Sequence, residues 1–284
     1  MKKLLIAGAF VLSCMSLSAQ VRTPQASPAA SIEQVVGLTN VKIEYSRPSA
    51  RGRSVYGELV PFGKLWRTGA NANTLISFSD DVVIAGKTLP KGEYALYTLP
   101  KADSWDIIFY TDTNNWGLPE KWDEKKEALR TTVKPDFLSR NVETFTIGLN
   151  NLDNDYAHLE IAWEKTMVSV KIEVPTQKTA LKSIETAMEG PTANDYFASA
   201  QYFYQSGADQ SKALDWINKA IAKTPSGKEV PFYYLRQKSL IQAKMGDRAG
   251  AIETAKQSLA AAEKANNADY VKMNKDSILE WSRK

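Results

Sequence analysis

Apolar and polar residues alternate along the first part of the chain with a period of two. Val41, Ile43 and Tyr45 are separated by the charged residues Lys42 and Glu44, and the alternation recurs at 76–78, 159–163 and 168–172. Clusters of Gly, Pro, Asn and Lys separate these runs. Because a period of two places alternate side chains on opposite faces of a strand, we expect roughly ten antiparallel strands in an all-β sandwich. We place this domain at residues 32–175.

After Pro175 the period changes to that of a helix, and small residues recur in two successive copies. The first copy has Tyr196, Ala200, Phe203, Gly207, Ala213, Ile217, Ala220 and Pro225; the weaker second copy has Leu235, Ser239, Gly246, Ala251, Ala255 and Ser258. This pattern resembles the tetratricopeptide repeat, with one extra residue after the glycine. A last amphipathic segment, Ala268 to Trp281, is typical of a capping helix. We therefore predict an α-helical repeat domain over residues 176–284.

Local patterns predict one helix within the sandwich and one turn. Residues 120–129 carry acidic and basic residues in alternation, which is typical of a solvated helical face. Asn151, Asp153 and Asp155 have the spacing of a calcium loop, but Tyr156 stands where that loop needs glycine, so we predict a hairpin turn instead.

His158 is the only histidine. Without a second His or a Cys it makes a poor metal ligand, and we expect a solvated position.

The N-terminus has the three parts of a secretory signal peptide. Lys2 and Lys3 precede an apolar run, and small residues lead to Ala19, after which we place the cleavage. Residues 20–31 then form a linker, and the protein is expected in the periplasm or outside the cell. A second interpretation uses the only cysteine, Cys14, as the lipidated N-terminus of a lipoprotein. No later run approaches the length of a membrane-spanning helix, so we predict no transmembrane segment after signal removal.

Charge and cysteine content exclude several classes of function. The formal net charge is +4, of which Lys2 and Lys3 supply half and leave with the signal peptide. The remaining charge is too small for a nucleic-acid-binding protein. Cleavage after Ala19 also removes the only cysteine, which excludes disulfides and thiolate chemistry. We predict no cofactor and no metal, and the spacing of Ser, His and Asp indicates no catalytic set.

A stretch rich in arginine gives the chain a family resemblance. Residues 45–74 read YSRPSARGRSVYGELVPFGKLWRTGANANT and hold four arginines. Together with GKTLPKGEYALYTLP at 86–100, SWDIIFY at 104–110 and NNWG at 114–117, this stretch resembles the exported bacterial family known as domain of unknown function 2911. The resemblance covers about residues 27–174. It implies an envelope protein, which helical repeats sometimes extend, and it implies no activity.

The same stretch supplies the candidate ligand-binding residues. Arginine binds carboxylate and phosphate through a planar fork and stacks on aromatic rings, while asparagine hydrogen-bonds sugars and anions alike. The candidates are Arg47, Arg53, Trp66, Arg67, Asn71 and Asn73. The alternative is that the arginines brace a long loop by binding backbone carbonyls and acids such as Glu58 or Asp80. Strand parity predicts Ala72 and Thr74 facing inward and both asparagines facing the opposite side.

Three functions fit these features. The first is an exported, non-enzymatic binding or scaffolding protein, with an anionic or sugar-like ligand at the candidate cluster and an envelope protein partner on the helical surface. The second is a carbohydrate-active or ester hydrolase, which requires two carboxylates in a cleft beside Trp66 and Arg67. The third is a structural spacer, in which Arg67 is buried and fully bonded to the backbone.

Overall fold

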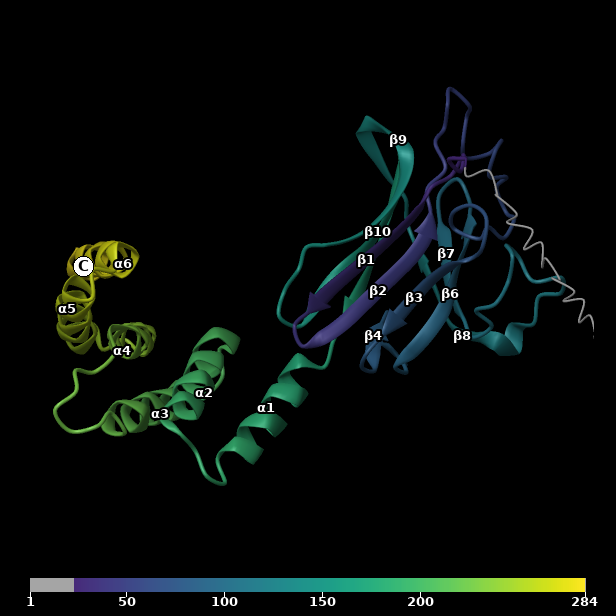
Figure 1. Ribbon diagram of the computed structural model, residues 1–284. Helices are drawn as coiled ribbons and strands as arrows, with labels where there is room; N and C mark the ends of the chain where they lie inside the picture. The colour runs from purple at the N-terminus through teal and green to yellow at the C-terminus, as the bar shows by residue number, and fades with distance from the viewer. Residues whose placement is uncertain (1–22, 284) are drawn as a thin grey trace, which may run out of the picture.

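A computed structural model describes residues 23–283 as ten strands followed by six helices (Figure 1). The predicted signal peptide lies outside the described residues. The strands are β1 (Ala29–Val36), β2 (Thr39–Ser46), β3 (Thr74–Phe78), β4 (Val82–Ile84), β5 (Lys87–Leu89), β6 (Gly92–Pro100), β7 (Trp105–Tyr110), β8 (Glu127–Val133), β9 (Asp136–Asn150) and β10 (Tyr156–Glu173). The helices are α1 (Thr176–Ala187), α2 (Ala193–Ser206), α3 (Gln210–Ala222), α4 (Phe232–Lys244), α5 (Arg248–Lys264) and α6 (Ala268–Ser282).

The strands form two antiparallel sheets, which confirms the predicted sandwich. One sheet has six strands in the order β1-β2-β3-β6-β7-β8, and the other has four in the order β5-β4-β10-β9. The alternating residues face as the sequence predicts: Val41, Ile43 and Tyr45 of β2 are buried, while Glu44 is exposed. The predicted turn at 151–155 joins β9 to β10 as a hairpin.

The main core lies between the two sheets and is rich in aromatic residues. Trp105 of β7, Phe145 of β9 and Trp163 of β10 are almost fully buried there. Each such side chain contributes roughly 1.5–3 kcal/mol to folding through burial. A second, smaller core lies beneath the loop between β7 and β8, where Trp122 stacks on Tyr110 and Tyr97 meets both rings edge-on. That loop is therefore held firmly on the six-stranded sheet.

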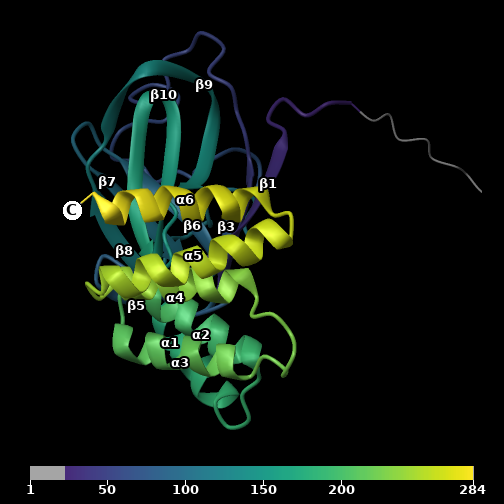
Figure 2. The same ribbon diagram turned by 90° about the vertical axis from the view of Figure 1, so that its left-hand side faces the viewer.

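The helices pair in antiparallel fashion, as the repeat pattern predicts. α2 packs on α3, α4 packs on α5, and α6 covers α5 at the C-terminal end (Figure 2). Thr192 and Asp195 form a capping box at the start of α2, and Gly207 ends it in the left-handed conformation. Ala200 and Ala213, the small residues predicted at the helix crossing, are completely buried. Among the described residues no helix is long and apolar enough to cross a membrane.

Two local predictions were wrong. Residues 120–129 do not form a helix, since only Glu124–Lys126 make a 3₁₀ turn and β8 begins at Glu127. Leu129 is buried in that strand, so pairing with β7 outweighs the local helical preference. Strand parity also fails before Thr74, where β3 begins. Ala72 is exposed and Asn73 is buried, the reverse of the prediction.

Candidate ligand-binding site

A cavity of about 460 Å³ opens at one end of the sandwich, beside the long loop between β2 and β3. Four of the six candidate residues line it, and two do not. Its lining consists of Ser27, Pro48, Arg53, Leu59, Val60, Trp66, Arg67, Gly69, Ala70, Asn71, Trp116 and Trp163. Arg47 and Asn73 are outside this lining. We refer to this space as the arginine–tryptophan cavity.

Hydrogen bonds hold this loop on the sheet beside the cavity. Trp66 pairs with Thr98 of β6 through two backbone hydrogen bonds of 2.8 and 3.0 Å. Thr68 is fully buried at a φ of 55°, where a β-branched residue is strained. The Thr74 hydroxyl donates to the Thr68 carbonyl at 2.6 Å and holds Thr68 in this conformation. Such strain costs roughly 1–3 kcal/mol and clusters at functional sites.

Arg47 braces the two sheets and is therefore unavailable to a ligand in the cavity. Its Nε donates to the Phe145 carbonyl at 3.0 Å, and its Nη2 donates to Thr146 Oγ1 at 2.8 Å. Both acceptors are on β9 of the opposite sheet. The bond to the Phe145 carbonyl is of the kind that the bracing alternative predicted for this residue.

Arg53 is exposed and has a double role. Its Nε and Nη2 donate to the carbonyls of Ala50 and Ser49 at 2.9 and 2.8 Å, which curls the loop on itself. These two bonds hold the guanidinium beside the cavity. The charge of Arg53 is not cancelled, because it has no ion pair among residues 23–283.

Arg67 is the candidate whose hydrogen-bonding capacity is least used. Its Nη1 donates to the Asn71 carbonyl at 2.6 Å, and its other nitrogens have no acceptor within the described part of the chain. Gly117 packs against the guanidinium so closely that an added Cβ would lie 2.7 Å from Nη1. The guanidinium is half-buried and held in place, yet most of its donors remain open.

The two asparagines position the walls of the cavity. The Asn73 side chain donates to the Thr113 carbonyl at 3.1 Å and accepts from the Asn115 backbone at 3.0 Å. It therefore holds the loop that carries Trp116. Asn71 donates to the Ser27 carbonyl and to Ser46 Oγ, both at 3.2 Å, and so fixes the N-terminal segment against β2.

Trp116 is a wall residue that the sequence candidates omitted. Its side chain is 80% exposed, which is unusual for an indole held in an ordered loop. Trp66, by contrast, belongs mainly to the core, where it stacks on Trp163 and donates its indole N–H to the Gly69 carbonyl at 3.1 Å. The NNWG sequence at 114–117 carried the available signal, because a tryptophan between polar residues and glycine is outside any strand pattern.

The lining of the cavity carries positive charge, and the buried phenol of Tyr97 supports it from below. None of the described residues that line it is acidic, whereas two are arginines. The carboxylate pair that the hydrolase alternative requires is therefore not found in this lining. Burial raises the pKa of Tyr97 to about 12, so its hydroxyl stays neutral and donates to the Gly117 carbonyl at 3.1 Å. That bond supports the backbone beneath Arg67.

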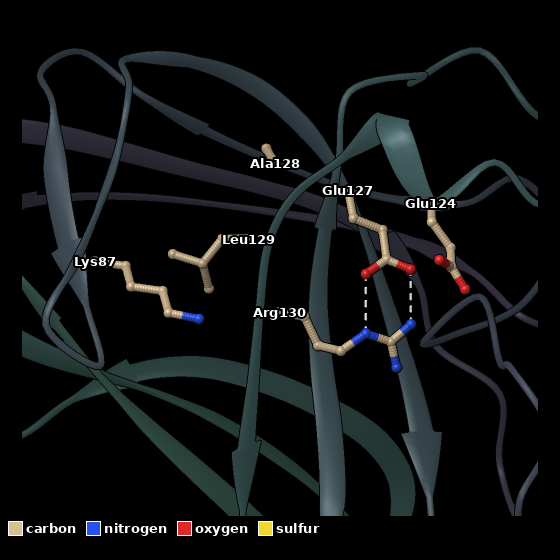
Figure 3. Close-up of a pocket in the computed structure, with 6 residues that line it drawn as sticks. All are labelled: Lys87, Glu124, Glu127, Ala128, Leu129 and Arg130. Atoms are coloured by element: carbon tan, nitrogen blue, oxygen red, sulfur yellow. Dashed lines mark hydrogen bonds and ion pairs between the residues drawn. The ribbon is translucent and has the colours of Figure 1, made fainter.

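A second cavity, of about 580 Å³, lies where the edges of the two sheets meet (Figure 3). Arg130 binds Glu127 through two hydrogen bonds of 2.7 and 2.9 Å and also contacts Asp106 at 3.0 Å. The Arg130 guanidinium therefore holds the pKa of Glu127 below its usual range. Because these charges satisfy one another, the cluster serves to fasten β8 to β7.

Metal-ligating residues do not gather in the described chain. Within residues 23–283, no group of three or more His, Cys, Asp or Glu side chains is placed to hold a metal ion. His158 is partly buried on β10, and its Nδ1 lies 3.1 Å from the Asn151 amide.

The fold and the cavity together define a two-sheet β-sandwich with a helical extension and a cationic, tryptophan-rimmed pocket. The chain belongs to the family described as "Protein of unknown function (DUF2911)", whose sequence profile matches residues 27–172. The match covers most of the sandwich and includes every residue that lines the arginine–tryptophan cavity. No curated protein matches the chain.

Proposed function

We propose that the protein is an exported, non-enzymatic binding protein of the cell envelope. Its sandwich holds an anionic or sugar-like ligand, best fitted by an acidic saccharide, in the arginine–tryptophan cavity. Its helices present a surface to an envelope protein partner. The signal-peptide pattern of the sequence supports export, with Cys14 lipidation as the alternative to cleavage after Ala19.

The open guanidinium of Arg67 beside the exposed indole of Trp116 carries this proposal. A saccharide ring stacks on an indole face, and a carboxylate or sulfate accepts from a guanidinium fork. The spacer alternative expects Arg67 fully bonded to the backbone, but only one of its nitrogens has such a bond. The acid-free lining gives the hydrolase alternative no support at this site.

Titration calorimetry of the mature chain with acidic and neutral saccharides tests the proposal. Glucuronate and N-acetylneuraminate oligomers serve as acidic probes, and the matching neutral oligomers serve as the comparison. We expect Arg67→Ala and Trp116→Ala each to weaken binding about 10- to 100-fold, since a charge-assisted hydrogen bond or a stacked ring contributes roughly 1.5–3 kcal/mol.

Two matched variants control for general effects. Arg140→Ala removes an exposed arginine on β9, and Phe137→Ala removes an aromatic side chain that is 78% exposed on the same strand. Neither lines the cavity, so both should bind as the wild type does. Equal weakening by Arg140→Ala, or absence of binding to every acidic probe, would contradict the proposal. Release of reducing ends that Arg67→Ala abolishes would instead favour the hydrolase.

A further inference from the structure

Another arginine of interest lies on the helical part of the molecule, far along the chain from the arginine–tryptophan cavity. Arg236 is in the second turn of α4 and is only partly exposed. Its Nη1 is buried without a hydrogen-bond partner, and no other nitrogen of its guanidinium donates to a described residue. No ion pair to Arg236 exists within residues 23–283 either. A buried charge without a partner is costly and calls for an explanation.

The neighbours of Arg236 are aromatic rather than acidic. Burial lowers the pKa of its guanidinium, and only the phenols of Tyr204 and Tyr270 act against that effect. Tyr204 is on α2 and Tyr270 is on α6, so three helices contribute to the surroundings of this one group. Tyr270 also contacts Phe232 of α4, with ring centres 4.7 Å apart.

These residues come from three helices that lie on one side of the helical stack. α2, α4 and α6 lie on the side of the stack that is turned toward the sandwich, and α3 and α5 lie on the other side (Figure 1). Phe232 and Arg236 lie about one turn apart on α4, and Lys244 lies about two turns beyond Arg236. We call the set Tyr204, Phe232, Arg236, Lys244 and Tyr270 the inner helical face.

The positive charges of Arg236 and Lys244 indicate what kind of ligand the inner helical face binds. Lys244 is exposed, lies 4.8 Å from the centre of the Tyr204 ring and donates to the Tyr204 carbonyl at 2.6 Å. Arg236 and Lys244 are eight residues apart, so the helix separates them by about 12 Å along its axis. A single terminal carboxylate does not span that distance. An extended segment, which advances roughly 3.3 Å per residue, spans it in three or four residues.

We propose that the inner helical face binds an acidic segment of a partner protein, in which two Asp or Glu side chains lie three or four residues apart. One carboxylate accepts from the fork of Arg236 between Tyr204 and Tyr270, and the other pairs with Lys244. The aromatic rings cover the apolar part of the segment. The proposed acidic segment specifies the kind of partner that the helical domain binds. It rests on the scaffolding part of the proposed function.

Fluorescence anisotropy with the mature chain tests this inference. The probe is a fluorescein-labelled, C-amidated dodecapeptide with two glutamates four positions apart, compared with the same peptide carrying glutamines. A third, neutral peptide with a free C-terminus separates side-chain from terminal carboxylates. We expect the wild type to prefer the glutamate peptide, and Arg236→Met to weaken its binding about 10-fold or more. Lys244→Met should weaken binding less, because its charge is exposed.

The controls distinguish specific binding from general attraction of opposite charges. Arg248→Met removes an exposed arginine at the start of α5 and should leave binding unchanged. Arg236→Met should also raise the melting temperature by about 2–5 °C, since it removes an uncompensated buried charge. Arg236→Lys, which keeps the charge without the fork, should retain part of the affinity.

Three results would overturn the inference: equal binding of the glutamate and glutamine peptides, equal weakening by Arg236→Met and Arg248→Met, or preference for the free C-terminus. Binding of saccharide probes by Arg236→Met should match the wild type. That comparison separates failure at this face from failure of the arginine–tryptophan cavity.

Discussion

At the residue scale, the three candidate arginines differ in what remains open to a ligand. Arg47 donates from two nitrogens to β9, and Arg53 donates from two nitrogens to its own loop. Arg67 makes one hydrogen bond and rests against Gly117, which leaves it the most available of the three. A guanidinium that is held in place and has free donors loses little entropy when a ligand binds.

Gly117→Ala tests this arrangement of Arg67. Gly117 has a φ of 100°, and its new methyl group would displace the flexible end of Arg67. The control, Gly63→Ala, has a φ of 71° and nothing within 4 Å of the new methyl group. We expect both variants to lose roughly 1–2 kcal/mol in urea unfolding, from the backbone conformation. Only Gly117→Ala should shift the Arg67 side-chain NMR signal and weaken saccharide binding; similar signals in both variants would contradict the role of Gly117.

The candidate site could be predicted from the sequence only where local rules apply. Residue types suited to anion binding marked Arg53, Trp66, Arg67 and Asn71, and these four do line one cavity. The sequence could not separate them from Arg47, because the acceptors of Arg47 lie nearly one hundred positions away on β9. Contacts between distant segments are decided by the tertiary fold.

At the element scale, strand and helix periods predicted the architecture, and their limits explain the errors. The alternation in β2 and the small residues of α2 follow from periodic burial. Parity failed at Ala72 because the chain adopts a left-handed turn at Asn71 before β3 begins. Residues 120–129 have the composition of a helix, but they lie beside the edge of a sheet, and from Glu127 onward they form strand β8.

The edge strand β8 gives a pH-dependent prediction. Arg130 and the Trp122 indole hold the pKa of Glu127 below its usual range. A lowered pKa in the folded state contributes stability above the unfolded pKa, and that contribution is lost as the pH falls through the folded value. Glu127→Gln should therefore cost about 1 kcal/mol at pH 7 and much less near pH 3.

Urea unfolding at the two pH values measures this difference. Glu124→Gln, which changes an exposed carboxylate without an ion pair in the described chain, controls for net charge. A Glu127→Gln penalty that stays constant between pH 7 and pH 3 would show that packing, and not the charge of Glu127, fastens β8.

At the scale of the whole molecule, the sandwich and the helices keep separate hydrophobic cores. The sandwich cluster runs from Val36 to Val174, and the cluster of α2 to α4 runs from Ala200 to Ile241. Their junction is small, and at it the Thr176 hydroxyl donates to the Asn154 carbonyl at 2.5 Å beside Gly37. Two sites of different chemistry, one on each part, suit a molecule that joins a ligand to a protein partner.

Separate cores predict separate unfolding. Heating should give two distinct transitions. Circular dichroism at about 222 nm monitors the helical transition, and the fluorescence of the buried tryptophans monitors the sandwich transition. Because repeats depend mainly on their neighbours, the helical transition should come first and be broader. A chain ending at Pro175 should fold and keep the sandwich transition at the same temperature. A single coincident transition in the full chain, or loss of folding on truncation, would contradict this prediction. Either result would mean that the junction couples the two parts far more strongly than its few contacts indicate.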